Sequence, residues 1–176
     1  MEENEKKLKE LILYIADRCA EDTTFGAVKL NKILYLSDFI AYGEFGKPIT
    51  GVEYMKLPNG PAPKRLLPIR EELVKAGELH IREISYFGRT QHRIIPLRKP
   101  RLDVFTQKEI SLVDHVINAL CGVSASDVST YTHKHAGWRV AEDKGTIPYE
   151  SVFLSDDPMT DDDIERGREL AARYGW

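Results

Sequence analysis

Apolar residues recur at intervals of three and four near the start of the chain, which is the spacing of one face of an α-helix. The first such stripe consists of Leu8, Leu11, Ile12, Ile15 and Cys19. A second helix is predicted over "AVKLNKILYLSDFIAYG" (residues 27–43), with a stripe of Leu30, Ile33, Leu34, Ser37 and Ile40, widened by Phe39. Because so much of its surface is apolar, we expect this helix to lie at the centre of the core.

The middle of the chain alternates between strand and helix patterns. "VEYMKL" (residues 52–57) has the alternation of a short strand and is followed by the breaker "PNGPAP". "KRLLPIREELVKAG" (residues 64–77) predicts a helix that either begins near Pro68 or is kinked there, since proline is tolerated only in the first turn. "ELHIREISYFGRTQHRIIPL" (residues 78–97) predicts a hairpin of two strands around "FGRT".

Helical patterns return in the last part of the chain. "TQKEISLVDHVINALCG" (residues 106–122) predicts a helix whose start is marked by a capping box of Thr106 and Glu109. Two shorter helices are expected over residues 124–135 and 137–145, and a last one begins where Thr160 can serve as the cap. The sequence therefore predicts a mainly helical α+β fold of six to seven helices with a small antiparallel sheet or hairpin, forming one domain over residues 1–176.

Composition narrows the class of protein. Hydrophobic residues make up 42% and charged residues 30% of the 176 positions, which is typical of a globular protein. No apolar run approaches the roughly 20 residues that span a bilayer, and the charged N-terminus does not resemble a signal peptide. Cys19 and Cys121 lie far apart without a CxxC motif. We therefore expect a cytoplasmic protein with reduced cysteines and no membrane partner.

Charge is distributed unevenly although the net charge is only −3. Residues 61–101 contain ten Lys or Arg against four Asp or Glu, whereas residues 102–176 contain seven against fourteen. This asymmetry has two interpretations, a nucleic-acid-binding face beside an acidic flank or two lobes that attract each other within one fold.

The stretch "VSTYTHKHAGWRVAEDKG" (residues 128–145) has the richest side-chain chemistry in the chain. Its histidines, His133 and His135, are two residues apart, and a zinc site would need further ligands such as His115 or Cys121, which no spacing requires. His133 has the chemistry of a general base, but no motif supplies a nucleophile. Phosphate loops and dinucleotide fingerprints are also absent. We therefore expect no metal, no cofactor and no enzymatic activity.

A winged-helix DNA-binding protein is the main physical alternative. In that interpretation, the arginines of the hairpin contact phosphates or a groove, and the residues that face the duplex include Lys64, Arg65 and Arg70. Three prolines crowd the supposed recognition helix, and about twenty residues separate it from the preceding helix, which disfavours a helix-turn-helix.

Three stretches together resemble the Panacea domain of the SocA-like antitoxin family. They are "KLNKILYLSDF", "GKPITGVEYMKLPNGPAP" and "VSTYTHKHAGWRVA", and the resemblance covers roughly residues 11–153. Val128 stands where leucine is usual, and Asn59 stands where an aromatic residue is common. The residues that carry the resemblance as a structural signature are Lys32, Tyr35, Gly60, Pro61, Thr132, His133 and Trp138.

The resemblance implies a mainly helical domain that neutralises a toxin by binding it, or that delivers it to a protease as an adapter. It brings no catalytic residue. Aromatic residues and arginine are enriched at the centres of protein interfaces. The predicted partner-binding residues are therefore Tyr86, Phe87 and Arg89 at the hairpin tip, together with Tyr42 and Phe45 in the turn after the second helix.

The same resemblance gives residues 128–145 a structural interpretation. We expect the hydroxyls and imidazoles to satisfy backbone groups where helices break, and Trp138 to open the second short helix and fill the core. On this hypothesis Trp138→Ala destabilises the protein by ~3–5 kcal/mol.

Overall fold

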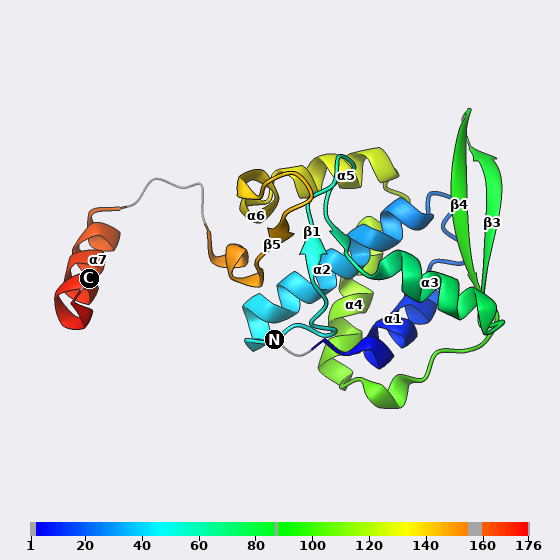
Figure 1. The fold of residues 1–176 in the computed structure, drawn as a ribbon, viewed down its shortest axis with the longest axis horizontal. Coiled ribbons are helices and arrows are strands. Elements are labelled where there is room, and N and C mark those ends of the chain that lie inside the picture. The colour runs from blue at the N-terminus through cyan, green and yellow to red at the C-terminus, as the bar shows by residue number, and fades with distance from the viewer. Residues whose placement is uncertain (1–2, 87, 155–159, 176) are drawn as a thin grey trace.

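The computed structural model describes residues 3–86, 88–154 and 160–175, and Figure 1 shows their arrangement. Within these residues, the α-helices are α1 (Glu5–Arg18), α2 (Ala27–Phe45), α3 (Leu66–Lys75), α4 (Gln107–Leu120), α5 (Ala125–His133), α6 (Ala136–Val140) and α7 (Asp161–Tyr174). The 3-10 helices are η1 (Leu102–Val104) and η2 (Tyr149–Phe153). The strands are β1 (Tyr54–Met55), β2 (Ala62–Pro63), β3 (Leu79–Tyr86), β4 (Arg89–Pro96) and β5 (Thr146–Ile147). The predicted mainly helical α+β fold is confirmed.

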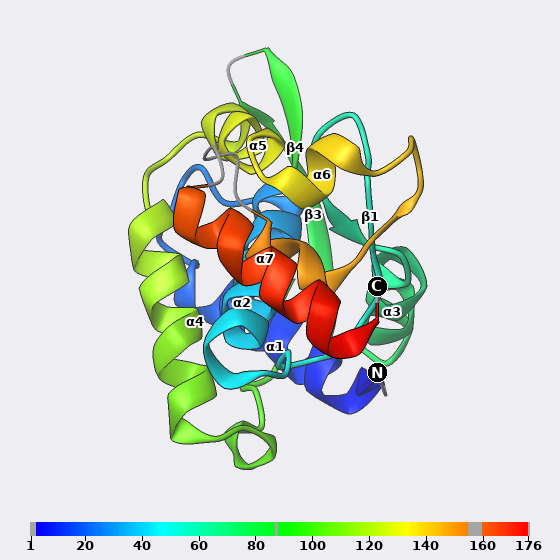
Figure 2. The same ribbon diagram turned by 90° about the vertical axis from the view of Figure 1, so that its left-hand side faces the viewer.

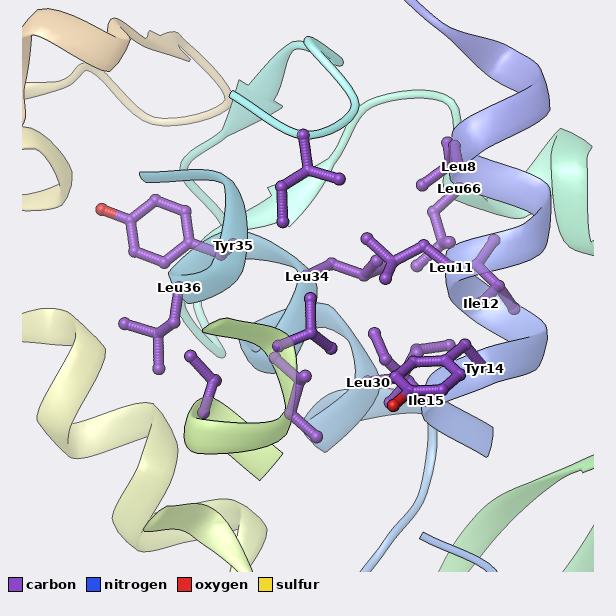
Figure 3. Close-up of a cluster of buried hydrophobic side chains, with 14 of the residues drawn as sticks. Leu8, Leu11, Ile12, Tyr14, Ile15, Leu30, Leu34, Tyr35, Leu36 and Leu66 are labelled. Atoms are coloured by element: carbon purple, nitrogen blue, oxygen red, sulfur yellow. The ribbon is translucent and has the colours of Figure 1, made fainter. Parts of the chain in front are cut away.

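Helix α2 is the central element of the fold. It packs against α1, α4, α5, β2, β4 and η2, so it has neighbours on nearly every side (Figure 1). From Lys29 to Phe39 every residue except Asn31 is buried. Figure 3 shows Leu30 and Leu34 of α2 meeting Leu11 and Ile15 of α1 in the hydrophobic core. The predicted central position is confirmed, but Ile40 is 38% exposed, so its place in the buried stripe was wrong.

A buried carboxylate fixes α2 to the segment that follows it. Asp38 is fully buried and accepts hydrogen bonds from the Thr50 backbone N–H (2.8 Å), the Thr50 hydroxyl and the Tyr54 hydroxyl (2.8 Å). The Tyr149 hydroxyl lies 3.4 Å from the same carboxylate and donates to the Val52 carbonyl at 2.7 Å. Burial raises the pKa of Asp38 despite these bonds. The network joins α2, the loop before β1 and η2, because a buried acid must satisfy its oxygens.

The small sheet differs from the prediction in its size. The strand predicted over residues 52–57 is reduced to β1, which pairs with β2 on one side and β5 on the other, both antiparallel. Tyr54 lies opposite Pro63 and Ile147. Strands of two residues carry no alternation pattern, so β2 and β5 were missed.

Pro68 lies in the first turn of α3, which agrees with the predicted alternative that the helix begins near it. The helix begins at Leu66, which places Pro68 at its third residue. The missing N–H of a proline has no carbonyl to reach in the first turn, so the helix loses no bond there. Gly77 follows the helix with a φ of +69°, which is the usual end signal.

Strands β3 and β4 form the predicted hairpin, which extends beyond the helices at its tip (Figure 1). Tyr86 pairs with Arg89, so the connection is shorter than the predicted "FGRT" turn. Arg93 donates to the Asp22 carbonyl at 2.6 Å and to the Ala20 carbonyl, which ties β4 to the loop between α1 and α2.

The basic segment 61–101 pairs mostly with the start of the chain. Arg98 bridges Glu10 and Glu78 at 2.8 Å each, Lys64 pairs with Glu53 and Lys99 pairs with Asp17. Arg70, predicted to face DNA, is 8% exposed. Within the described residues, the Lys and Arg side chains of residues 61–101 that form ion pairs therefore do so with acids of residues 3–78. They do not pair with acids of the C-terminal part of the chain.

The last part of the chain follows the predicted helices with shorter bounds. The capping boxes at Thr106 and Thr160 are present. Helix α6 ends at Val140, earlier than expected, because Ala141 adopts an extended backbone, and a turn then leads to β5. Helix α7 stands apart from the other elements in Figure 1 and lies in front of them in the view of Figure 2, and its described residues contribute nothing to the core. Among the described helices, none is both long and apolar enough to cross a lipid bilayer.

Candidate functional site

The signature residues other than Tyr35 come together around one loop, residues 57–61. This loop lies between α2 on one side and α5 and α6 on the other, and three polar contacts hold it. Lys32 Nζ of α2 donates to the Pro61 carbonyl at 3.1 Å. Trp138 Nε1 of α6 donates to the Leu57 carbonyl at 3.3 Å. The Gly60 N–H donates to the Leu57 carbonyl at 2.8 Å, which closes the turn.

Lys32 is the most unusual ionisable group of the cluster. Its side chain is 1% exposed, and its one hydrogen bond in the described structure goes to a carbonyl rather than a carboxylate. Burial lowers the pKa of Lys32 from 10.5 to about 8. In contrast, the equally buried Lys29 lies 2.6 Å from the Asp22 carboxylate. A buried charge without an opposite charge beside it destabilises the folded state, so a lysine is an unexpected residue at position 32.

Residue 60 has to be glycine for two reasons, its left-handed backbone conformation and the side chains packed against it. Its φ is +93°, and a Cβ placed there would lie 2.8 Å from both Lys32 Cε and Thr132 Oγ1. Thr132 is fully buried and donates to the Ser129 carbonyl at 2.9 Å. The loop can therefore pass between α2 and α5 only if residue 60 has no side chain.

His133 and Trp138 form a stacked pair at the outer side of the loop. Their ring centroids are 4.0 Å apart with an interplanar angle of 15°. Lys56 Nζ lies 4.6 Å from the Trp138 ring centroid and donates to the Ala141 carbonyl at 3.0 Å. Burial, and then the charges of Lys32 and Lys56, lower the pKa of His133. Trp138 lies in the first turn of α6 and packs against the hydrophobic core, but it is only partly buried.

Tyr35 and His135 extend the cluster toward the next groove. The Tyr35 hydroxyl lies 3.4 Å from His135 Nδ1, and burial raises the pKa of Tyr35 while lowering that of His135. The structure places His115 on α4 and Cys121 at its end. Among the described residues, no group of three or more His, Cys, Asp and Glu side chains is arranged to hold a metal ion.

The predicted partner-binding residues fall into two distant groups. Tyr42 and Phe45 lie in the last turns of α2 rather than in the turn after it. Tyr86 and Arg89 pair at the end of the hairpin, and Phe87 lies outside the described residues. The hairpin approaches the other end of α2, where the Gln91 amide donates to the Thr23 carbonyl at 3.2 Å just before the helix begins. Nineteen helical residues separate these ends by roughly 28 Å, so the structure does not unite the two groups.

Tyr42 is held within the fold, whereas Phe45 belongs to an open surface. The Tyr42 ring packs on Tyr149 and Phe153 at centroid distances of 5.5 and 5.9 Å, and its hydroxyl donates to Glu150. Phe45 is 37% exposed in a groove between the end of α2 and α4.

A continuous apolar surface covers the C-terminal half of α2. A second groove runs between α2, α6 and η2, and Ile40 and Glu44 line both grooves. Large apolar side chains remain in water here, with exposed fractions of 67% for Phe153 and 55% for Leu154. We define the α2 surface as Ile40, Phe45, Phe153 and Leu154. Sequence reasoning missed three of these residues, because Ile40 fits a core stripe and the other two have no periodic signal.

Comparison with known proteins gives a family but no individual relative. No curated protein and no solved structure matches the chain. The model of the family described as "Antitoxin SocA-like, Panacea domain" matches residues 30–139, which is more than half of the chain. The match begins in α2 and ends one residue after Trp138, so it contains every signature residue that meets around residues 57–61. The chain therefore belongs to the SocA-like antitoxin family and contains a Panacea domain.

Proposed function

We propose that this protein is a cytoplasmic antitoxin that neutralises a partner toxin by binding it directly through the α2 surface, without catalysis. The observation that carries the proposal is the exposure of four large apolar side chains along two joined grooves. Soluble proteins seldom expose such a contiguous apolar surface unless it is covered by a partner.

The rim of the α2 surface fits the usual anatomy of a protein interface. Glu44, Lys108 and Lys134 line the two grooves around the apolar centre. Interfaces of standard size bury about 800 Å² on each partner, with an apolar centre and a polar rim. The tip of the hairpin lies too far away to belong to the same compact contact.

The experiment begins with the toxin, identified as the protein that copurifies with the tagged chain and arrests growth when expressed alone. Wild-type antitoxin should restore growth. Phe45→Glu and Ile40→Glu should abolish rescue and weaken binding at least ~30-fold, the size of a hot-spot loss of about 2 kcal/mol. Leu67→Glu is the matched control, since Leu67 is 66% exposed on α3, outside both grooves.

Two results would count against this proposal. Full rescue by Phe45→Glu and Ile40→Glu would move the interface elsewhere. A toxin whose half-life shortens only when both antitoxin and a host protease are present would instead support an adapter that delivers the toxin for degradation.

A further inference from the structure

Helix α7 carries an apolar face that the other described elements leave uncovered. Ile164, Gly167 and Ala171 follow one another at intervals of three and four residues, with Leu170 beside them, so they lie on one side of the helix. Ile164 is 37% exposed, and a Cβ placed at Gly167 would meet nothing within 4 Å. Among the described residues of α7, none belongs to the hydrophobic core. The helix is therefore amphipathic, and its apolar face is open to water.

A helix of this kind needs a surface to pack against. The 14 residues of α7 are close to the length at which isolated helices are marginal in water, because most helical stability in proteins comes from packing of the apolar face. Gly167 weakens α7 further, since glycine is unfavourable inside a helix. The same glycine leaves no side chain in the middle of the apolar face, so another helix can approach closely. These features are those of a helix that docks.

The groove between α2 and α4 has the length of α7. One face of α4 lines the groove from residue 107 to residue 119, a distance of about 20 Å, and the 14 residues of α7 span about 21 Å. The apolar residues on this face of α4 are Leu112, Val116 and Ala119, and α2 contributes Ile40 and Phe45 to the same groove. An amphipathic helix that lies in such a groove buries its apolar face against both helices.

The groove has a direction, because α2 and α4 are antiparallel. Phe45 at the end of α2 and Lys108 at the start of α4 line the same groove. At the opposite end, Lys29 of α2 donates to the Val123 carbonyl, just after α4, at 3.0 Å. The end with Lys108 suits the acidic start of a helix, since opposite charges attract.

Helix α7 reaches this end of the groove first. Phe153 packs on Tyr42 of α2 at a centroid distance of 5.9 Å, and the six residues between Leu154 and α7 let the chain span at most about 25 Å. Figure 1 shows α7 beyond the C-terminal end of α2, and Figure 2 shows it in front of α2. The first turn of α7 consists of acids, at residues 161–163, which complement Lys108.

We propose that α7 docks in the groove between α2 and α4, antiparallel to α2, and competes there with the toxin for Ile40 and Phe45. The competition rests on the proposed function, whereas the docking does not. Figure 1 shows the undocked arrangement, in which the α2 surface is open. With about three quarters of the molecules docked, toxin binding is about fourfold weaker than binding to undocked protein.

The docking is tested by zero-length carbodiimide cross-linking of the dilute full-length protein, with the linked peptides identified by mass spectrometry. Wild type should form an intramolecular amide bond between Lys108 and an aspartate of residues 161–163. The double variant Ile164→Gln and Leu170→Gln should lower the yield of this bond at least threefold. Ala172→Gln is the matched control, because Ala172 is exposed on the other side of α7. The substituted residues lie outside the core, so the fold is preserved.

The docking is overturned if wild type forms no such bond, or if the double variant and the control give equal yields. A covalent dimer in place of the intramolecular bond would also overturn it, and would place α7 on a second copy of the chain.

The competition is tested with the same variants and the purified toxin. The double variant should bind the toxin about fourfold more tightly than wild type, and Ala172→Gln should bind it as wild type does. Equal affinities of the double variant and wild type would overturn the competition. Full growth rescue by Phe45→Glu, together with an intact bond to Lys108, would reject the toxin site and the competition but not the docking.

Discussion

At the scale of single residues, the signature positions are defined by contacts rather than by chemistry. Lys32, Gly60 and Trp138 are far apart in the sequence, yet each contacts or belongs to the same loop. Polar contacts to backbone carbonyls hold the loop of residues 57–61 in place. Substitutions of Lys32, Gly60 or Trp138 should therefore lower the stability of the protein, and more so where the residue is more buried and more tightly packed.

Replacement of Trp138 should be less costly than a core substitution. Because Trp138 is only partly buried, we expect Trp138→Ala to lower the free energy of unfolding by about 2–3 kcal/mol, at the lower end of large-to-small costs. Trp138→Phe keeps a ring against His133 and loses only the bond to Leu57, at about 1 kcal/mol. Urea denaturation measures both, and equal losses for the two variants would show that the ring itself contributes nothing.

Lys32 should make stability depend on pH in a recognisable direction. Its pKa is about 8 in the native state and 10.5 in the unfolded chain, so the unfolded state holds more protons between these values. Stability contributed by this residue therefore rises with pH across the window from about 8 to about 10.5. Between pH 7 and 9.5 the gain should be about 2 kcal/mol for wild type.

Lys32→Met isolates that contribution. Tyr14 and Cys19, whose pKa values are raised to about 12, act in the opposite direction at high pH, but they are present in both proteins. The stability of Lys32→Met relative to wild type should therefore fall as pH rises. A constant difference in urea midpoints between pH 7 and 9.5, at equal m-values, would mean that Lys32 titrates at its ordinary pKa.

Gly60→Ala should be far more damaging than Gly46→Ala. Both glycines have positive φ values, +93° and +71°, but a Cβ at residue 46 meets nothing within 4 Å. We expect about 1 kcal/mol for Gly46→Ala and several kcal/mol more for Gly60→Ala, since Lys32 and Thr132 are fixed by burial. Thermal unfolding compares them, and similar melting temperatures would show that the loop can shift.

At the scale of elements, the hairpin is attached by buried charge rather than by apolar packing alone. Burial by itself would raise the pKa of Glu10, but the bonds from Arg98 and the Arg101 N–H outweigh it and lower the pKa. The ion pair therefore stabilises the native state fully above the ordinary glutamate pKa, and this stability is lost as the pH falls from there through the lowered native pKa.

Removal of Arg98 should leave Glu10 buried with too few partners. Arg98→Ala is expected to cost about 3 kcal/mol, the effect of leaving one half of a buried pair. Lys99→Ala should cost less than about 0.5 kcal/mol, because the Lys99 side chain is 84% exposed in its pair with Asp17. Chemical denaturation at pH 7 distinguishes the two, and equal effects would contradict a special role for Arg98.

At the scale of the whole molecule, the core is complete without α7. The buried cluster ends at Tyr149, with Val152 packed against it, and includes no described residue of α7. The single domain predicted over residues 1–176 is therefore testable by shortening the chain.

A chain that ends at Leu154 should melt within about 3 °C of the full-length protein, which corresponds to less than about 1 kcal/mol for a domain of this size. A chain that ends at Gly145 should be strongly destabilised, because it lacks β5 and the Tyr149 hydroxyl that bonds Val52. A large loss on removal of residues 155–176 alone would show that α7 belongs to the stable domain.

The sequence by itself determined the helices, the hairpin and the central position of α2, because periodic patterns of ten or more residues reflect which face is buried. It also identified the family through three separated stretches. The tertiary structure alone decided the roles of Asp38, Lys32 and Ile40. A buried acid, a buried lysine and an exposed isoleucine all depend on neighbours from distant segments, and local periodicity carries no information about those neighbours.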